Sequence, residues 1–508
     1  MANYLLGIDN GSTVAKAAIF TAEGKEVAVS GRKVDLLSPQ PGYSEADMEG
    51  LWQLTAEAIA EALSRSGLSA SDIGGVACTG HGNGLYLVDE RCRPVRPAVR
   101  GPDTRARAYI DRWLADGVDS VVRPKTMQAL WPGQPNALLA WMRDHEPESL
   151  ARATAALTCT DYIRGRLTGA LHTEVTNMSG TSLLNVGTGQ YDPEVFAAFG
   201  ISEMQRLLPP LCRPETICGQ VTPEASEATG LAVGTPVAGG MFDIDACGLG
   251  SGLIDERQMC MIAGTWGNNQ YIARQPVVDP DVFMSTCYAL EGYYLMLEGS
   301  ATSASNLEWF VTELMPAERR LEGLCRFSIF DLCNQLVGET RPEEAGITFL
   351  PFLYGANVSL DGKAAFFGLD GWQSRGHVLR AVYEGVIFSH HWHLDRLMRF
   401  RSRPERIRLS GGAARSEVWL QMFADILQLP VEVPAGSELG ALGAAIGAAV
   451  AVGLYESYPA ACEAMVRIER CREPDPGVAE VYGRKYARYR RLLEVLAPVW
   501  SELVWQGV

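Results

Sequence analysis

Hydrophobic and polar residues form distinct blocks at the start of the chain. Residues 4–8 are a short apolar run, residues 9–13 (Asp-Asn-Gly-Ser-Thr) have turn chemistry, and residues 14–20 are apolar apart from Lys16. Two apolar runs joined by a polar, glycine-containing segment are typical of a β-hairpin. The pattern predicts this hairpin, followed by a third strand near residues 26–34.

Helical and extended patterns alternate in the next segment. Apolar residues recur at helical spacing from about Met48 to Ser66, which predicts an amphipathic helix. Residues 73–79 and 85–88 predict two strands separated by a glycine-rich loop. Alternation of this kind is typical of an α/β domain.

The strand–turn–strand pattern returns near the middle of the chain. Residues 235–242 predict a strand that enters Asp243, and residues 246–252 predict a helix of small residues. Residues 259–263 and 269–273 then predict a second hairpin around a Gly-Thr turn.

This repetition predicts two α/β domains, residues 1–250 and residues 251–508. The length of 508 residues agrees with at least two domains at roughly 150 residues each. A charged amphipathic pattern from about residue 475 to residue 505 predicts a helix that docks on the surface.

Composition narrows the class of protein. The chain carries 60 acidic against 44 basic residues, a formal charge of −16, which argues against a nucleic-acid or membrane-surface partner. Its twelve cysteines are scattered without a Cys-x-x-Cys pair, so we expect neither a disulfide framework nor a zinc site. No signal peptide and no apolar run of about 20 residues is recognised, and we expect a cytoplasmic protein.

Phosphate binding is the chemistry that the two turns favour. The chain contains neither a Walker-type loop nor a Gly-x-Gly-x-x-Gly segment after a strand. Hairpin turns can bind phosphate instead, because successive backbone N–H groups point into a concavity and Ser or Thr hydroxyls add donors. Residues 9–13 and 264–267 both have this composition.

Three segments together resemble a known family. Residues 9–13, 264–266 and 410–416 resemble, in order and spacing, the two phosphate motifs and the adenosine motif of the FGGY carbohydrate kinases, which belong to the actin-like ATPase superfamily. Further family-like segments are residues 41–45, 80–84, 239–243, 298–300 and 441–447. The resemblance implies an α/β fold of two actin-like (ribonuclease H-like) domains, with a nucleotide and sugar cleft between them.

The resemblance also implies an activity. Such an enzyme would use ATP and Mg²⁺ to phosphorylate a terminal primary hydroxyl of a small sugar. The most similar subgroup is the bacterial one that acts on the ketopentose L-xylulose. The segments that resemble this subgroup are residues 37–42, 189–193, 306–310, 349–355 and 383–390. Erythritol, ribitol and glycerol remain alternative substrates. A non-catalytic sugar and ATP sensor, and an assembly or chaperone ATPase, are alternatives of other classes. The expected partner is a small sugar or polyol, and a homodimer is a family-level expectation.

Three carboxylates are assigned roles through the resemblance. Asp243 matches the catalytic base, although an Asp at that place could simply cap the following helix. Asp9 matches the residue that positions Mg²⁺ through water, against a plain turn-forming role. Asp245 would contact substrate or organise water around the metal, with a structural cap as its alternative; it would share a face with Asp243 in an extended segment but diverge from it in a helical turn.

The remaining nucleotide contacts come from the turns and the adenosine motif. Lys16 is one of only six lysines and is expected near the phosphates, against a solvated position. The full set of predicted nucleotide contacts is Asn10, Gly11, Ser12, Thr13, Lys16, Gly264, Thr265, Gly411, Gly412, Ala413 and Ser416. Ser416 stands where many family members have Asn.

Sugar contacts are expected from two other loops. His81 lies in the glycine-rich loop 80–84, where related kinases have a substrate-binding histidine. Asp103 matches the acidic sugar-binding position, with a local Asx turn after Pro102 as its alternative. Trp131 and Asn136 are weaker candidates from the same comparison, and either side chain could instead belong to the core.

Overall fold

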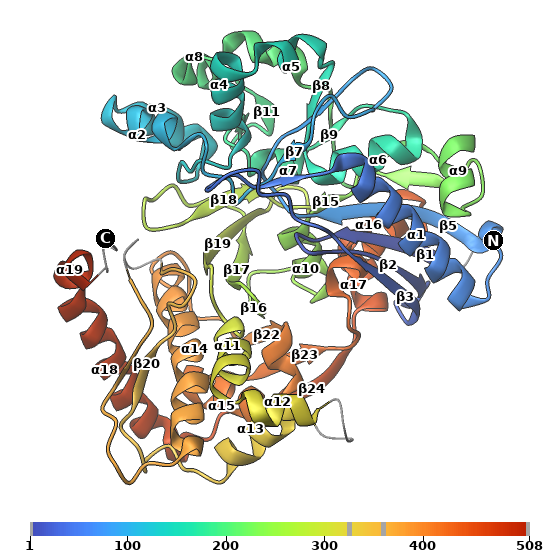
Figure 1. The fold of residues 1–508 in the computed structure, drawn as a ribbon. Helices are drawn as coiled ribbons and strands as arrows, with labels where there is room; N and C mark the ends of the chain where they lie inside the picture. Colours follow the sequence, from blue (N-terminus) through green and yellow to red (C-terminus); the bar gives the residue numbers. More distant parts are fainter. Residues whose placement is uncertain (1–3, 323–327, 357–361, 504–508) are drawn as a thin grey trace. The chain divides into compact units, whose positions relative to one another are not determined.

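The computed structural model describes residues 4–322, 328–356 and 362–503. These residues form two compact units. The first contains the chain up to Ile254 together with 272–296 and 436–467, and the second contains 255–271, 297–435 and the chain from residue 468 onward. Each is an α/β unit built on a mixed sheet, as the sequence predicts, and Figure 1 shows the elements in chain order.

The first sheet begins with the predicted N-terminal hairpin. Its strands are ordered β13-β14-β5-β1-β2-β3, and β15 also pairs with β5. The hairpin pairs Tyr4 with Thr21 and Asn10 with Ala15, and β5 runs parallel to β1. The strands span Tyr4–Asn10 (β1), Val14–Thr21 (β2), Glu26–Lys33 (β3), Ile73–Gly80 (β5), Ile217–Gln220 (β13), Pro236–Ala238 (β14) and Met241–Phe242 (β15).

Helices cover both faces of this sheet. Leu6 and Ile8 point to one face and pack with α1 (Met48–Ser66) and α6 (Cys159–Thr168) in a single apolar core. Residues that alternate with them face α16 (Leu439–Ala451). A Cβ on Gly7 would lie 1.9 Å from the carbonyl oxygen of Ala441, so glycine is needed there for α16 to approach.

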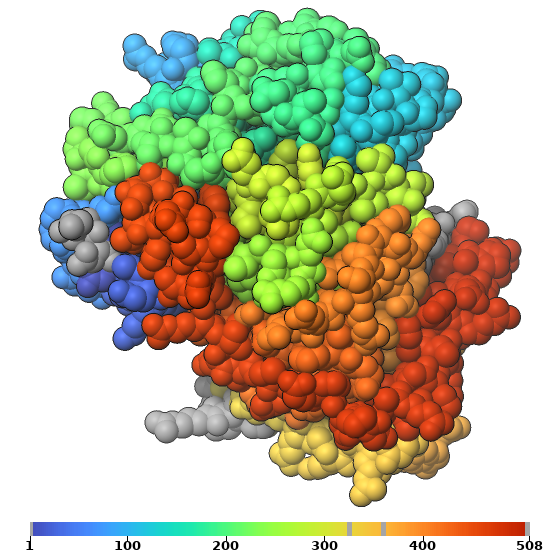
Figure 2. All heavy atoms as spheres, turned by 180° about the vertical axis from the view of Figure 1, so that it is seen from behind, coloured from blue at the N-terminus to red at the C-terminus, as the bar shows by residue number. Residues whose placement is uncertain are grey.

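The first unit therefore joins the N-terminal strands to a segment near the end of the chain. The hydroxyl of Tyr455 donates to the carbonyl of Ala22 at 2.8 Å. In Figure 2 the orange-red atoms of this segment, which includes α17 (Tyr458–Met465), lie against the blue atoms of the N-terminal strands. Helix α10 (Asp243–Gly250) packs against α16 in the same unit.

A second apolar core of the first unit lies between β5 and β14 in sequence. It is formed mainly by short helices, with Trp113, Leu138 and Phe196 among its buried residues. The helices span Arg107–Ala115 (α2), Val118–Thr126 (α3), Pro135–His145 (α4), Pro147–Arg152 (α5), Val175–Ser179 (α7) and Pro193–Phe199 (α8). Strand β18 (Met284–Cys287) joins this region through the donation of Ser285 N–H to the Met127 carbonyl.

The second unit repeats the hairpin plan. Its sheet has the order β19-β17-β16-β22-β23-β24, with β16 and β17 antiparallel and β22 parallel to β16. The strands span Gln258–Ala263 (β16), Gly267–Ala273 (β17), Tyr294–Ser300 (β19), Arg406–Ser410 (β22), Val431–Pro434 (β23) and Ile468–Arg472 (β24).

Helix α14 (Arg375–Leu397) is the central helix of this second unit and contacts α11 (Ser305–Leu314), α13 (Ile329–Gly338), α15 (Glu417–Leu427) and α18 (Ala479–Leu496). The amphipathic C-terminal helix is confirmed as α18, which buries Tyr482, Tyr486 and Tyr489. Residues 504 and 505, at the end of the predicted helical segment, lie outside the described residues.

Two remaining expectations concern cysteines and membranes. No cysteine in the described part of the chain forms a disulfide, and Cys325 lies outside that part. Among the described residues no helix is both long and apolar enough to cross a bilayer. The apolar stretch near residue 440 is the buried helix α16.

Candidate active site

Asp243 is the first residue of helix α10. The predicted strand over 235–242 is interrupted, because Gly239 and Gly240 separate β14 from β15 and Gly240 has φ +79°. The following helix begins at Asp243 rather than at residue 246, since an acidic residue in the first turn is favoured by the helix dipole. Phe242 is the N-cap, and Asp243 occupies the first helical position, where its carboxyl accepts a hydrogen bond from the Ile244 N–H.

The Asp243 carboxyl has a pKa suited to proton transfer. Burial raises its pKa to about 7, and the neighbouring Asp9 carboxylate adds to the rise. The backbone N–H of Ile244 opposes the shift by hydrogen bonding. A general base works best when its pKa lies near the working pH. Asp243 therefore has the electrostatic properties of a base at neutral pH.

Asp9 lies near the end of β1, where α16 begins. Burial raises the pKa of Asp9 to about 6, and the Lys16 ammonium opposes that rise. A Cβ on Gly440 would come within 2.6 Å of Oδ2 of Asp9. The glycine thus gives the Asp9 carboxylate its space beside the first turn of α16.

The turn after Asp9 contains both a buried residue and exposed residues. Asn10 is buried, and its Oδ1 accepts a hydrogen bond from the Thr55 hydroxyl of α1 at 2.8 Å. Ser12 and Thr13 are exposed, and Gly11 N–H donates to the Val14 carbonyl at 3.1 Å. Only the exposed part of this turn presents free hydroxyls.

The turn of the second unit is built in a similar way. Gly264 N–H donates to the Trp266 carbonyl at 3.2 Å, and Thr265 is exposed. The carbonyls of Gly264 and Thr265 accept the N–H groups of Ala304 and Ser303. These bonds fix the turn and leave the Thr265 hydroxyl in solvent.

The adenosine motif shows two structural roles. Gly411 has φ +90°, and a Cβ on it would lie 2.6 Å from the carbonyl carbon of Ala263, so packing within the unit requires glycine there. Gly412 opens a 3₁₀ turn in which Ala413 is fully buried. Ser416 is the N-cap of α15, and its Oγ accepts the Trp419 N–H at 3.0 Å.

His81 is held in a neutral state beside the first turn. Its backbone N–H donates to the Asn10 carbonyl at 3.0 Å, and its Nε2 is hydrogen-bonded to the Tyr86 hydroxyl at 3.0 Å. Burial and then the Arg100 guanidinium lower the pKa of His81 to about 4. A neutral imidazole at this place suits hydrogen bonding to an uncharged hydroxyl.

The Asp103 carboxylate is already satisfied by the protein. Both of its oxygens accept hydrogen bonds from Arg105 at 2.9 Å, and Oδ2 also accepts the Ser44 N–H at 2.7 Å. Its side chain is 0% exposed. This network fixes the loop but leaves Asp103 no exposed oxygen.

Asp245 faces away from Asp243. The two residues lie two positions apart on α10, and such positions diverge on a helix. Oδ1 of Asp245 accepts the Ala289 N–H at 3.1 Å, while Oδ2 is buried without a hydrogen-bond partner among the described residues. Burial raises the pKa of Asp245 well above its usual range, and the Glu174 carboxylate adds to this.

Several buried polar groups of the first unit are left without hydrogen-bond partners. Among the described residues these are Oδ1 of Asn83, Nε1 of Trp131 and both side-chain ends of Asn136. Asn83 and Trp131 both border Gly101, since a Cβ there would lie 3.7 Å from each. Buried polar groups without partners are unusual in proteins and point to a polar ligand or ordered water.

Two of the residues just described were not predicted from the sequence. Asn83 has φ +61°, and the Asn-Gly pair at 83–84 was the available signal for this backbone geometry. Arg100 is buried, and its Nη2 donates to the Ser12 carbonyl at 2.6 Å. It links the His81 loop to the first turn, and no local pattern marks it.

The comparisons with known proteins define the class. Residues 4–250 match the N-terminal domain, and residues 259–452 the C-terminal domain, of the FGGY family of carbohydrate kinases. The chain belongs to this family. It is an ATP-dependent carbohydrate kinase with the two-domain actin-like fold that the sequence predicts.

Within the family, the chain is similar to xylulose kinases. The chain is 38% identical to a probable L-xylulose kinase of Pasteurella multocida, over 97% of this chain and 99% of the relative. It is 36% identical to the L-xylulose/3-keto-L-gulonate kinase of Escherichia coli, over 98% of each. A xylulose kinase structure from Rhodospirillum rubrum matches with a TM-score of 0.86 at 27% identity, covering 98% of this chain and 100% of that one. These relatives are kinases, which leaves the sensor alternative without support.

Proposed function

We propose that this protein transfers the γ-phosphoryl group of ATP to a terminal primary hydroxyl of a ketopentose such as L-xylulose, with Asp243 as the general base. The observation that carries the proposal is the position of Asp243 at the start of α10, with burial and Asp9 raising its pKa to about 7. In phosphoryl transfer an acidic residue accepts the proton of the attacking hydroxyl.

The donor set near Asp243 suits Mg²⁺. Asp9 and Asp243 are two carboxylates whose charges interact, and no group of three or more His, Cys, Asp or Glu side chains among the described residues is arranged to hold a metal directly. Mg²⁺ keeps several waters and uses only one or two carboxylates beside substrate phosphates. When bound, Mg²⁺ would neutralise charge on the β- and γ-phosphate oxygens. Asp9 would hold it through water.

The protein's other groups bind and orient the two substrates. In the first unit the turn 11–13, in which Ser12 and Thr13 are exposed, would donate to phosphate oxygens together with Lys16. In the second unit the turn at Gly264 and Thr265 would do the same. Gly411–Ala413 and Ser416 would border adenosine. These assignments rest on the family motifs and on the exposed hydroxyls.

Sugar recognition would fall to uncharged groups. Neutral His81 and the unpartnered Asn83, Trp131 and Asn136 offer donors and acceptors for hydroxyls, whereas Asp103 would hold its loop in place through Arg105. A ketopentose is supported by the names of the relatives that are 36–38% identical, and a relative named erythritol kinase is 28% identical. The proposal also includes a domain boundary near residue 250, a cytoplasmic location and a homodimer.

The experiment is an ADP-release assay over ketopentoses, erythritol, ribitol and glycerol. We expect the highest kcat/KM with L-xylulose. Asp243→Asn should lower kcat by roughly 100- to 10,000-fold, the usual contribution of a general base, while ATP binding is retained. Asp245→Asn is the comparison on the same helix, and its KM for sugar tests whether Asp245 contacts substrate. Turnover of Asp243→Asn within a few-fold of the wild type would refute the assignment.

A further inference from the structure

Arg100 is a buried arginine with no carboxylate partner among the described residues. It follows β7 (Ala98–Val99) and is 4% exposed. Its Nη2 donates to the Ser12 carbonyl at 2.6 Å, and within the described ranges its side chain forms no other hydrogen bond and no ion pair. A guanidinium carries several N–H donors in a fixed fork, so most donors of Arg100 are left without an acceptor from the protein.

Two other arginines in the described part of the chain are buried to the same degree, and each lies beside a carboxylate. Nη2 of Arg164 lies 2.9 Å from Oδ1 of Asp161, and Nη1 of Arg380 lies 3.7 Å from Oε1 of Glu384. A buried charge is costly unless it is paired and hydrogen-bonded. The exception at Arg100 therefore points to an anionic ligand.

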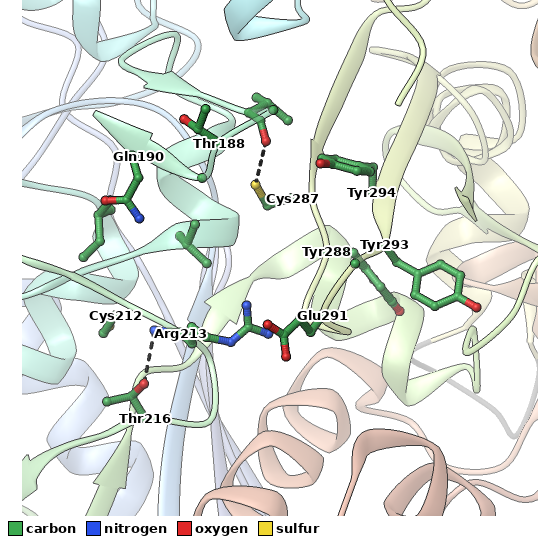
Figure 3. A pocket seen from close by; sticks show the side chains of 16 residues that line it. Thr188, Gln190, Cys212, Arg213, Thr216, Cys287, Tyr288, Glu291, Tyr293 and Tyr294 are labelled. Atoms are coloured by element: carbon green, nitrogen blue, oxygen red, sulfur yellow. Dashed lines mark hydrogen bonds between the residues drawn. The ribbon is translucent and has the colours of Figure 1, made fainter. Parts of the chain in front are cut away.

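The cavity in Figure 3 is a weaker candidate for binding an anion, although it is also lined by an arginine, Arg213. Nε of Arg213 lies 2.6 Å from Oε1 of Glu215. Figure 3 shows the same guanidinium directed toward Glu291, whose charge also acts on it. Two carboxylates of the protein already compensate the charge of Arg213.

The edge of the first sheet brings the first turn and the proposed base together. Gly80, the last residue of β5, pairs in register with Asn10 of β1 and with Phe242 of β15. Both pairings are parallel, so the residues that follow the three strands leave the sheet at one edge. Asp243 directly follows Phe242, and Arg100 joins this edge through its hydrogen bond to the first turn.

The guanidinium lies between the groups proposed for phosphate and those proposed for sugar. It holds the carbonyl of Ser12, whose residue is exposed in the phosphate turn. Its charge helps to lower the pKa of His81, a proposed sugar contact. The next residue, Gly101, borders Trp131, since a Cβ there would lie 3.7 Å from the indole ring. An anion at this place would be the group that passes from one substrate to the other.

We propose that Arg100 is a further catalytic residue, whose unpaired N–H groups bind oxygens of the γ-phosphoryl group during transfer. This inference rests on the proposed function of the site. The sugar hydroxyl oxygen forms a bond to phosphorus, the bond from phosphorus to the ADP oxygen breaks, and the hydroxyl proton moves to Asp243. Arg100 stays protonated throughout. Its planar fork of donors matches phosphate oxygens, and such a donor stabilises the charge of the transition state.

The test compares Arg100→Ala with the wild type, with L-xylulose as an uncharged acceptor. We expect kcat to fall roughly 100- to 1,000-fold, the usual effect of removing one donor to the transition state. In calorimetry, the affinity for β,γ-imido-ATP, which keeps a γ-phosphoryl group, should fall about tenfold through loss of a charged hydrogen bond. The affinity for ADP should stay within a few-fold, because ADP lacks that group.

Arg206→Ala is the matched control. Nη2 of Arg206 also donates to a backbone carbonyl, that of Leu150 at 2.8 Å, and the residue lies in a 3₁₀ helix, Ser202–Leu207, of the same unit. This variant loses an arginine-to-carbonyl contact of the same kind. It should keep kcat and should bind β,γ-imido-ATP and ADP as the wild type does.

Arg100→Lys covers the case in which Arg100→Ala fails to fold. One ammonium cannot donate to the Ser12 carbonyl and to phosphoryl oxygens with the geometry of a planar fork, so kcat should still fall at least about tenfold while ADP binding is retained.

Two results would overturn the proposal. The first is a kcat with L-xylulose close to that of the wild type in a folded Arg100 variant, which would leave Arg100 for an acceptor that itself carries a carboxylate. The second is an equal loss of affinity for ADP and for β,γ-imido-ATP, which would give Arg100 only a structural role in the first turn. Failure of the wild type to phosphorylate any acceptor in the ADP-release assay would instead refute the proposed function.

Discussion

The ammonium of Lys16 lies 2.7 Å from Oε2 of Glu438, a residue 422 positions further along the chain. Lys16 stands opposite Asp9 in the first hairpin, and Glu438 directly precedes α16. The pair joins the proposed phosphate turn to the helix whose first turn borders Asp9. Its partial exposure leaves the ammonium accessible to a second anion.

This arrangement predicts a competition between Glu438 and phosphate for Lys16. Lys16→Ala should raise the KM for ATP about tenfold or more, the equivalent of ~1.5–3 kcal/mol for a hydrogen bond to a charged group, and should leave the KM for sugar nearly unchanged. Glu438→Gln is the matched control, and it should lower the KM for ATP because the ammonium is released. Steady-state kinetics with each substrate varied checks both variants. An unchanged KM for ATP in Lys16→Ala would return the residue to a structural role.

Gly440 offers a way to move Asp9 without changing its charge. A Cβ at this position would lie 2.6 Å from Oδ2 of Asp9, so Gly440→Ala should displace the carboxylate. Small displacements in an active site can cost roughly 100-fold, and we expect kcat/KM to fall by about 10- to 100-fold with a higher Mg²⁺ requirement.

The control for Gly440→Ala is Gly483→Ala in α18, where nothing lies within 4 Å of the added Cβ. That change should leave activity intact and stabilise the helix by up to about 1 kcal/mol. Activity measured against Mg²⁺ concentration for both variants shows whether only Gly440→Ala needs more Mg²⁺. Equal magnesium dependence in the two would remove Asp9 from the proposed metal site.

Much of the fold follows from local patterns. The helix predicted from Met48 to Ser66 has those limits in the structure, because its apolar spacing is regular and Gly67 ends it in the left-handed conformation. Both hairpins were predicted from two apolar runs around a polar turn. These features depend on neighbours in sequence, which is why the sequence alone predicts them.

Other features depend on contacts that no local pattern encodes. The break before Asp243 follows from Gly240, where a Cβ would lie 2.1 Å from the Cys78 carbonyl of another strand. The sequence predicts Asp103 at a sugar-binding position or in an Asx turn, and the structure adds that its carboxylate accepts hydrogen bonds from Arg105 and from the distant Ser44 N–H. The start of α10 and the state of Asp103 therefore required the three-dimensional structure.

Ser416 has a measurable structural role in addition to its predicted nucleotide contact. Its Oγ accepts the Trp419 N–H and donates to Oδ1 of Asn334 at 2.6 Å. Ser416→Ala should lower the free energy of unfolding by about 1 kcal/mol, as loss of an N-cap usually does. Ser416→Asn keeps a capping oxygen and should retain stability. Urea unfolding measures this effect, and a raised KM for ATP in Ser416→Ala but not in Ser416→Asn would show the nucleotide contact separately.

Glu174 should make stability fall as pH rises. Burial raises its pKa to about 8, although hydrogen bonds from Thr176 and Asn177 oppose the shift. Because the folded-state pKa exceeds the unfolded value of 4.5, the native state holds the proton more tightly. The resulting stabilisation is fully present below about pH 4.5 and is lost as pH rises toward 8.

Glu174→Gln tests this effect because glutamine cannot ionise. The variant should be less stable than the wild type at pH 5.5, since one acceptor for the Thr176 and Asn177 donors is lost. The difference in stability between the two proteins should shrink or reverse by pH 8.5, because only in the wild type does ionisation of the buried Glu174 carboxyl destabilise the native state. Thermal melting of both proteins from pH 5.5 to pH 8.5 measures how the melting temperature of each depends on pH. Parallel pH profiles would mean that Glu174 is already ionised in the native protein at pH 5.5.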